Sequence, residues 1–178
     1  GNFLKNVRKL ANKFNKILIF DECTTGFRET FGGIYKKYGI EPDMVVYGKA
    51  LGNGYPISCV VGKKEIMDTK RKTFISSTFW TERIGPAAAL ETLKIMESEK
   101  SWKIISKIGK KVNQNWKKLS LKYKIPLTIQ GIPALTNFYF NDEKNNLKYR
   151  SFIIQCLLKK KYLASNTFYS SIAHTDKI

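Results

Sequence analysis

Asp21 and Lys49 are the residues whose types and positions most clearly suggest chemistry. Each follows a four-residue apolar run, at residues 17–20 and 44–47. Runs this short, bounded by polar residues or glycine, predict fully buried strands of a parallel sheet. Because ligands of open α/β sheets bind beyond the carboxyl ends of the strands, we expect both charges at a ligand-binding edge. The residues between them include a glycine-rich turn and a predicted short helix, and provide the crossover that parallel strands need.

A carboxylate and a lysine at one sheet edge match what pyridoxal phosphate chemistry requires. The lysine amine forms a Schiff base with the aldehyde of this cofactor, and the carboxylate pairs with its protonated pyridine nitrogen. The charged nitrogen lets the ring accept electrons when a bond at the substrate's α-carbon breaks. An isolated pair also has a plainer interpretation, in which Lys49 is solvated and Asp21 caps the next helix.

The residues around the pair favour the cofactor interpretation. Asp-Glu-Cys-Thr-Thr-Gly-Phe-Arg occupies residues 21–28, and Gly-Lys-Ala-Leu-Gly-Asn-Gly-Tyr-Pro occupies residues 48–56. Together with further segments, these motifs resemble the class III aminotransferases, and most of all glutamate-1-semialdehyde 2,1-aminomutase and its relatives. The resemblance runs in order along nearly the whole chain, and its further segments are residues 39–43, 62–68, 76–80, 83–90 and 173–176.

The resemblance implies a role for five residues. Asp21 matches the aspartate that pairs with the pyridine nitrogen, and Lys49 matches the Schiff-base lysine. Cys23 stands where the family usually has a valine packed against the cofactor ring, and Thr24 matches a residue near the cofactor's phenolic oxygen. Thr78 matches a threonine that reaches across a dimer interface to the phosphate of the partner's cofactor. The implied catalytic unit is a homodimer, and the implied substrate is a small amine or amino acid.

The implied fold is α/β, that of a fold-type-I pyridoxal phosphate-dependent transferase. Residues 1–97 would form the C-terminal part of the large cofactor-binding domain, with a parallel-rich sheet. Residues 98–178 would form an incomplete α+β small C-terminal domain. The chain opens without methionine inside an amphipathic helix and stops where another helix should start. We therefore expect an internal or C-terminal fragment, inactive alone, because the family's phosphate-binding loop and most substrate contacts lie upstream.

Apolar periodicity predicts the remaining elements. Short alternating or apolar runs predict strands at residues 57–61, 73–77, 127–130 and 135–140. Spacings of three and four predict helices at residues 4–14, 86–97, 102–123 and 147–161.

The net charge of +18 suggests a different class of function, a non-catalytic basic binding module. A further alternative to the enzyme is an inactive remnant of it. The excess is concentrated in residues 101–178, where lysines on the helix from Trp102 mostly avoid the apolar stripe. A solvated lysine face explains this pattern, and 27 lysines against 5 arginines do not favour base recognition. We expect no specific nucleic-acid partner.

Cysteine spacing and hydropathy give the remaining expectations. Cys23, Cys59 and Cys156 form no metal-binding spacing, so we expect no metal, and a sparse, odd set of cysteines fits the cytoplasm. No apolar stretch approaches membrane-spanning length, so we expect no membrane partner. His174 resembles a structural residue before a helix start, since no nucleophile motif accompanies it.

Overall fold

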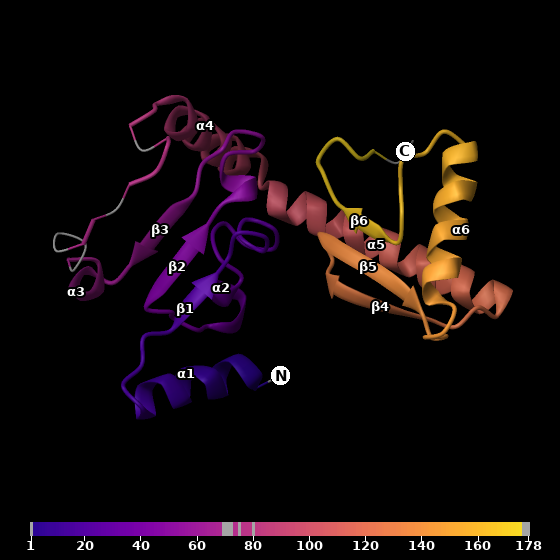
Figure 1. The fold of residues 1–178 in the computed structure, drawn as a ribbon, viewed down its shortest axis with the longest axis horizontal. Coiled ribbons are helices and arrows are strands. Elements are labelled where there is room, and N and C mark those ends of the chain that lie inside the picture. Colours follow the sequence, from indigo (N-terminus) through magenta and orange to yellow (C-terminus); the bar gives the residue numbers. More distant parts are fainter. Residues whose placement is uncertain (1, 69–72, 75, 80, 176–178) are drawn as a thin grey trace. The chain divides into compact units, whose positions relative to one another are not determined.

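Two three-stranded sheets, one in each half of the chain, organise the protein (Figure 1). The computed structural model describes residues 2–68, 73–74, 76–79 and 81–175. The chain divides into two compact units, Gly1–Ser101 and Trp102–Ile178. Their identification with a large and a small domain of a longer enzyme, with a boundary at residue 97, stays a prediction.

The first sheet has the order β1-β2-β3. β1 (Ile19–Asp21) pairs in parallel with β2 (Met44–Tyr47), and β3 (Cys59–Gly62) pairs antiparallel with β2. The parallel pair confirms the crossover predicted between Asp21 and Lys49. The sheet is therefore mixed, with one parallel and one antiparallel pairing, where a parallel-rich sheet was expected. The helices of this unit are α1 (Phe3–Lys13), α2 (Tyr35–Tyr38), the 3-10 turn η1 (Lys49–Leu51), α3 (Lys64–Met67) and α4 (Ile84–Glu99).

Burial in the first unit centres on β2 and the turns that follow it. Val45 is 4% exposed, and it packs in a cluster with neighbouring buried residues, Phe27, Tyr47, Ala50, Leu51 and Ala89. The prediction of full burial was wrong for β1, because Ile17 and Ile19 are more than half exposed. Among the described residues, β2 pairs with a strand on each side, whereas β1 pairs with β2 alone.

Two further predictions differ from the structure in this unit. The strand expected at residues 73–77 is absent from the described residues of that range, and residue 75 lies outside the described residues. The helix expected from residue 86 begins two residues earlier, at Ile84. Glu82 accounts for this start, because its two carboxylate oxygens accept hydrogen bonds from the backbone N–H groups of Ile84 and Gly85, both at 2.7 Å.

Asp43, which precedes β2, joins three elements of the first unit. Its carboxylate accepts hydrogen bonds from Arg8 of α1 at 2.8 Å, from Lys63 after β3 at 2.7 Å, and from the backbone N–H of Leu18 at 2.8 Å. Its side chain is only 10% exposed. The Lys63 hydrogen bond, then that from Leu18 and the Arg8 guanidinium, hold the pKa of Asp43 well below its usual range. Asp43 thus holds together the residues that directly precede β1 and β2.

The second unit is a sheet with long helices. The strands β4 (Leu127–Ile132), β5 (Leu135–Phe140) and β6 (Thr167–Tyr169) are antiparallel in the order β4-β5-β6. The helices are α5 (Ser101–Tyr123) and α6 (Asn146–Lys159). The bounds of β4, β5, α5 and α6 confirm the strands and helices predicted for this half within a few residues at each end, whereas β6 was not predicted. The apolar stripe of α5 packs on the sheet, where the rings of Trp116 and Phe138 lie 4.8 Å apart in an edge-to-face contact.

Candidate active site

Lys49 lies in a tight turn directly after β2. It is the first residue of η1, and its φ of 40° places a non-glycine residue in the left-handed region. This region is costly for a side chain with a Cβ. The Lys49 side chain is exposed, and its Nζ donates a hydrogen bond to Oγ1 of Thr24 at 2.8 Å. Thr24 belongs to the turn that follows β1, so one hydrogen bond links the carboxyl ends of the two parallel strands.

Asp21 is the last residue of β1, and its carboxylate is exposed. Its Oδ1 accepts a hydrogen bond from the backbone N–H of Cys23 at 2.9 Å. That hydrogen bond, aided by the Cys23 thiol and by the positive charge of Lys49, lowers the pKa of Asp21. Asp21 is therefore a carboxylate anion at neutral pH, available to a cationic partner on the solvent side.

Cys23 lies half-buried beside this carboxylate. Burial, and then the adjacent Asp21 carboxylate, raise the pKa of the Cys23 thiol. The side chain is therefore a neutral thiol, which behaves as a small apolar group. This agrees with the expectation that Cys23 packs as a valine would. Its contact with a cofactor ring stays a prediction.

The structure thus brings together four of the five residues predicted from the sequence. Thr78 lies in an exposed turn, and among the hydrogen bonds of the described residues none joins it to Asp21, Cys23, Thr24 or Lys49. Its implied role, in the site of a second subunit, stays a prediction.

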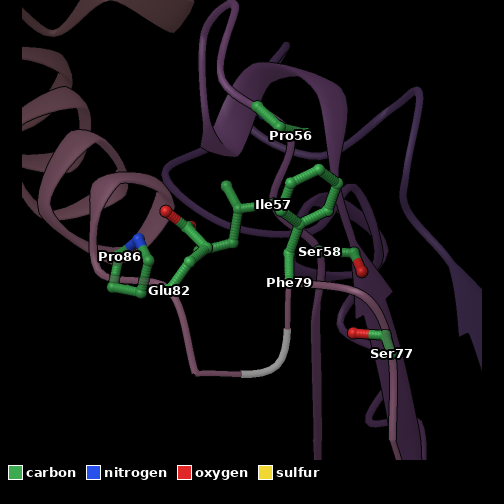
Figure 2. Close-up of a pocket in the computed structure, with 7 residues that line it drawn as sticks. All are labelled: Pro56, Ile57, Ser58, Ser77, Phe79, Glu82 and Pro86. Carbon is green, nitrogen blue, oxygen red and sulfur yellow. The ribbon is translucent and has the colours of Figure 1, made fainter.

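The residues on either side of Thr78 line a pocket of about 570 Å³ in the first unit. Figure 2 shows the ring of Phe79 and the hydroxyls of Ser58 and Ser77 at this pocket, with Glu82 near the start of α4. The lining residues are Pro56, Ile57, Ser58, Ser77, Phe79, Glu82 and Pro86. None of the five predicted site residues lines this pocket, so it is a separate hollow.

Glu22 is a residue of this region to which the sequence motifs gave no role. It follows Asp21 directly, but Asp21 is exposed whereas only 1% of Glu22 is exposed. Its Oε2 accepts a hydrogen bond from the hydroxyl of Thr25 at 2.5 Å, and its Oε1 accepts a longer one from the backbone N–H of Tyr35 at 3.4 Å. Strand alternation places residues 21 and 22 on opposite faces, and this signal in the sequence could have predicted the burial.

The chemistry of the four clustered side chains fits pyridoxal phosphate. An exposed carboxylate held in its ionised form suits a pyridinium N–H, and a lysine amine suits an aldehyde. Metal chemistry has no comparable support, since the described part of the chain contains no group of three or more His, Cys, Asp or Glu residues arranged to hold an ion. Within the same part of the chain, no helix is long and apolar enough to cross a membrane.

Curated relatives of this chain include both aminotransferases and aminomutases. The chain is 36% identical over 146 residues to 3-aminobutyryl-CoA aminotransferase of Cloacimonas acidaminovorans, covering 82% of this chain and 35% of the relative. It is 31% identical over 195 residues to glutamate-1-semialdehyde 2,1-aminomutase of Bdellovibrio bacteriovorus, covering 99% of this chain and 45% of the relative. The chain therefore spans less than half the length of these relatives.

Solved structures of aminotransferases share the fold. The FumI protein of Sphingopyxis sp. MTA144, solved as its pyridoxal phosphate internal aldimine, matches with a TM-score of 0.91 and 26% identity over 98% of this chain and 42% of its own. Acetylornithine aminotransferase of Elizabethkingia anophelis matches with a TM-score of 0.85 and 26% identity, covering 99% of this chain and 48% of its own. These similarities confirm the predicted fold class, that of fold-type-I pyridoxal phosphate-dependent transferases.

The family model for class-III aminotransferases matches residues 1–162, which is most of the chain. The match confirms the resemblance carried by the motifs around Asp21 and Lys49. The chain belongs to the class-III aminotransferase family.

Proposed function

We propose that this chain carries the catalytic lysine and the pyridine-pairing aspartate of an enzyme that transfers amino groups with pyridoxal 5'-phosphate. The observation that supports this most directly is the pairing of Lys49 and Thr24, 2.8 Å apart, beside the ionised Asp21. These residues meet where two parallel strands end, and ligands of open α/β sheets bind at such an edge.

Class-III membership and the internal aldimine of the FumI protein indicate pyridoxal 5'-phosphate as the cofactor. This cofactor supplies an electron sink for the bond that breaks at the substrate's α-carbon. We assign Lys49 as the lysine that attaches to the cofactor aldehyde. The Lys49 amine would also carry the proton to and from the substrate's α-carbon. Asp21 keeps its negative charge against the pyridine nitrogen and so holds the proton there.

Thr24 and Cys23 have positioning roles in this proposal. The Thr24 hydroxyl accepts a hydrogen bond from Lys49 and so sets the direction of its amine. The neutral Cys23 thiol offers a small apolar surface for the cofactor ring, while its backbone N–H orients the Asp21 carboxylate. Thr78 is proposed to contact the cofactor phosphate of a partner subunit, so the complete enzyme would be a homodimer.

Two reactions remain within this proposal. A transaminase gives the amino group to a second substrate, whereas an aminomutase returns it to a neighbouring carbon of the same molecule. Curated relatives of both kinds align with this chain at similar identity, 36% and 31%. We therefore propose amino-group transfer on a small amine or amino acid, without choosing between these two outcomes.

Chemical trapping tests the assignment of Lys49 in the full-length protein. Pyridoxal phosphate is added, the complex is reduced with borohydride, and the labelled peptide is identified by mass spectrometry. We expect the label on Lys49 and its loss in Lys49→Ala. Lys94→Ala is the matched control, because Lys94 is an exposed lysine of α4 whose partner is Glu91. Labelling of a different lysine in the unchanged protein, or retained labelling in Lys49→Ala, would overturn the proposal.

A further inference from the structure

The turn that follows β1 carries both contacts that hold the candidate site together. Within residues 22–26, the backbone N–H of Cys23 holds the Asp21 carboxylate, and the hydroxyl of Thr24 holds Nζ of Lys49. Neither residue is anchored by its own burial, since both are only partly buried. The geometry of the site therefore depends on what fixes the turn.

Glu22 fixes this turn at three points. Its backbone N–H donates to the carbonyl of Val46 in β2 at 2.8 Å, and its carbonyl accepts from the N–H of Gly26 at 2.8 Å. Its side chain accepts from the Thr25 hydroxyl at 2.5 Å, which closes the turn a second time. A carboxylate that accepts short hydrogen bonds in a buried setting makes stronger bonds than a neutral acceptor does.

The residues around Glu22 leave space for its side chain and contact it. A Cβ added at Gly33 would overlap the Tyr35 ring and would also lie 2.8 Å from Oε1 of Glu22, so glycine at this position leaves room for both side chains. The hydroxyls of Tyr35 and Tyr47 lie 3.3 Å apart in the same region, and the Glu22 charge helps to raise the pKa of Tyr47, after burial and Tyr35. Glu22 thus ties β1, α2 and β2 together beneath the site.

We propose that Glu22 is a positioning residue of the active site, which acts through Thr25 to set the Thr24 hydroxyl against the amine of Lys49. It does not itself touch the reacting atoms. The inference rests on the proposed function, because positioning Lys49 matters for catalysis only if Lys49 is the catalytic lysine. The effect of Glu22 on the reactivity of Lys49 is measured without cofactor.

The experiment measures the reactivity of Lys49 in the cofactor-free, full-length protein. Limited reductive methylation with isotopic formaldehyde, read by mass spectrometry, gives the rate at Lys49 relative to the other lysines of the same chain. Loss of the Thr24 hydrogen bond frees the amine, and a bond of about 1 kcal/mol corresponds to roughly a fivefold rate change. We expect a rise of about fivefold in Thr25→Val and in Glu22→Leu, and no rise in Thr25→Ser, which keeps the hydroxyl.

The double variant Glu22→Leu/Thr25→Val separates positioning from stability. Glu22→Leu removes the acceptor of the Thr25 hydroxyl and of the Tyr35 N–H, whereas the double substitution removes the Thr25 hydroxyl as well. The urea midpoint of the double variant should therefore lie above that of Glu22→Leu, part of the way back towards the unchanged protein. Positioning predicts that Lys49 stays about fivefold more reactive in the double variant. If the Lys49 rate recovers together with the stability, Glu22 has only a structural role and the proposal is wrong.

Glu29→Gln is the matched control for losing a carboxylate in the same loop. Glu29 has a side chain only 6% exposed and pairs with Lys37 at 2.9 Å, outside the 22–26 turn. We expect this variant to leave the relative rate at Lys49 unchanged, and an equal rise there would overturn the proposal.

Because no cofactor is present, these results stand apart from the borohydride test. Failure of that test with intact coupling would reject the function but keep the positioning role.

Discussion

Nζ of Lys49 and Oγ1 of Thr24 are joined by a 2.8 Å hydrogen bond between the turns that follow two neighbouring parallel strands. The two residues are 25 positions apart in sequence, and the parallel pairing of β1 with β2 brings them together. Asp21 is the last residue of β1 and lies at the same edge. The site therefore contains a carboxylate, a hydroxyl and an amine, all at the carboxyl ends of β1 and β2.

We predict that Asp21→Asn lowers kcat of the full-length enzyme by roughly 10²–10³-fold, the range found when one preorganised electrostatic contact is removed. Asparagine keeps the shape and can still accept the Cys23 N–H bond, but it has no charge to hold a proton on the pyridine nitrogen. The measurement is kcat at saturating cofactor and substrate. Cofactor occupancy, measured by absorbance in the same samples, separates weak binding from slow chemistry. An unchanged kcat would contradict the role given to Asp21.

Asp43 should make the stability of the first unit depend on pH. Because its folded pKa is depressed, its contribution is fully present above the unfolded value of about 3.9 and is lost as the pH falls through the folded pKa. We expect Asp43→Asn to lower the free energy of unfolding by about 2–3 kcal/mol at pH 7. Between pH 5 and pH 3 the variant should lose less further stability than the unchanged protein does, because it has no carboxylate at this position to protonate. Urea unfolding at both pH values measures this difference.

Glu91→Gln is the comparison for Asp43→Asn. Glu91 and Lys94 form an exposed pair at 3.3 Å, and such pairs contribute less than about 1 kcal/mol. The loss at pH 7 should therefore be much smaller than for Asp43→Asn. Equal losses in the two variants would show that Asp43 is not the residue that holds α1 and the strands together.

The lysine face of α5 should bind nucleic acid only weakly and without sequence preference. α5 contains seven lysines and no acidic residue, so exposed ammonium groups can release counterions from phosphates. We expect a DNA duplex to bind with a dissociation constant of roughly 10⁻⁴–10⁻⁶ M and to be released by moderate salt. Fluorescence anisotropy at several salt concentrations measures this.

The control for the lysine face is a charge reversal elsewhere. Lys107→Glu/Lys118→Glu on α5 should weaken DNA binding more than Lys5→Glu/Lys9→Glu on α1, which changes the net charge equally. Sequence-selective binding that survives moderate salt would instead support the basic binding module over the enzyme.

Residues 1–178 expressed alone should not be a working catalyst. The chain spans less than half the length of its curated relatives. The proposed site would supply contacts to the cofactor's nitrogen, aldehyde and one ring face only. Positioning contributes roughly 7–11 kcal/mol to enzymatic rate acceleration, so a loosely held cofactor forfeits most of it. The assay is amino-group transfer from a panel of amines and amino acids with added pyridoxal phosphate. Turnover equal to that of the full-length protein would refute this prediction.

The sequence predicted the parallel strands because short apolar runs bounded by polar residues or glycine are a local signal. Exposure is not local: Ile17 and Ile19 belong to a run with the composition of a buried strand, yet both are more than half exposed in the part of the chain that the structure describes. β6 was missed because three residues carry too little periodicity to indicate a strand.

The site was predicted for a different reason. Asp21 and Lys49 stand out by charge at strand ends, whereas Thr24 and Cys23 followed only from the family resemblance. Glu22 carries the same charge as Asp21 beside it, so charge alone does not separate the two residues. Only the alternation of faces at the end of β1 signals its burial, and its contacts with Thr25 and Tyr35 form only in the folded chain. Sequence patterns therefore pointed to the proposed reacting groups, Asp21 and Lys49, more readily than to Glu22, the residue proposed to position them.

Gly109 determines which side of α5 faces solvent. A Cβ at this position would overlap the carbonyl oxygen of Pro133, so the helix backbone lies directly against the loop between β4 and β5. Turning α5 by one residue about its axis would bring the Lys110 side chain into a space that admits only hydrogen. Glycine at position 109, on the opposite face of the helix, thus determines the direction in which the seven lysines point. Substitutions among the lysines themselves would leave that orientation unchanged.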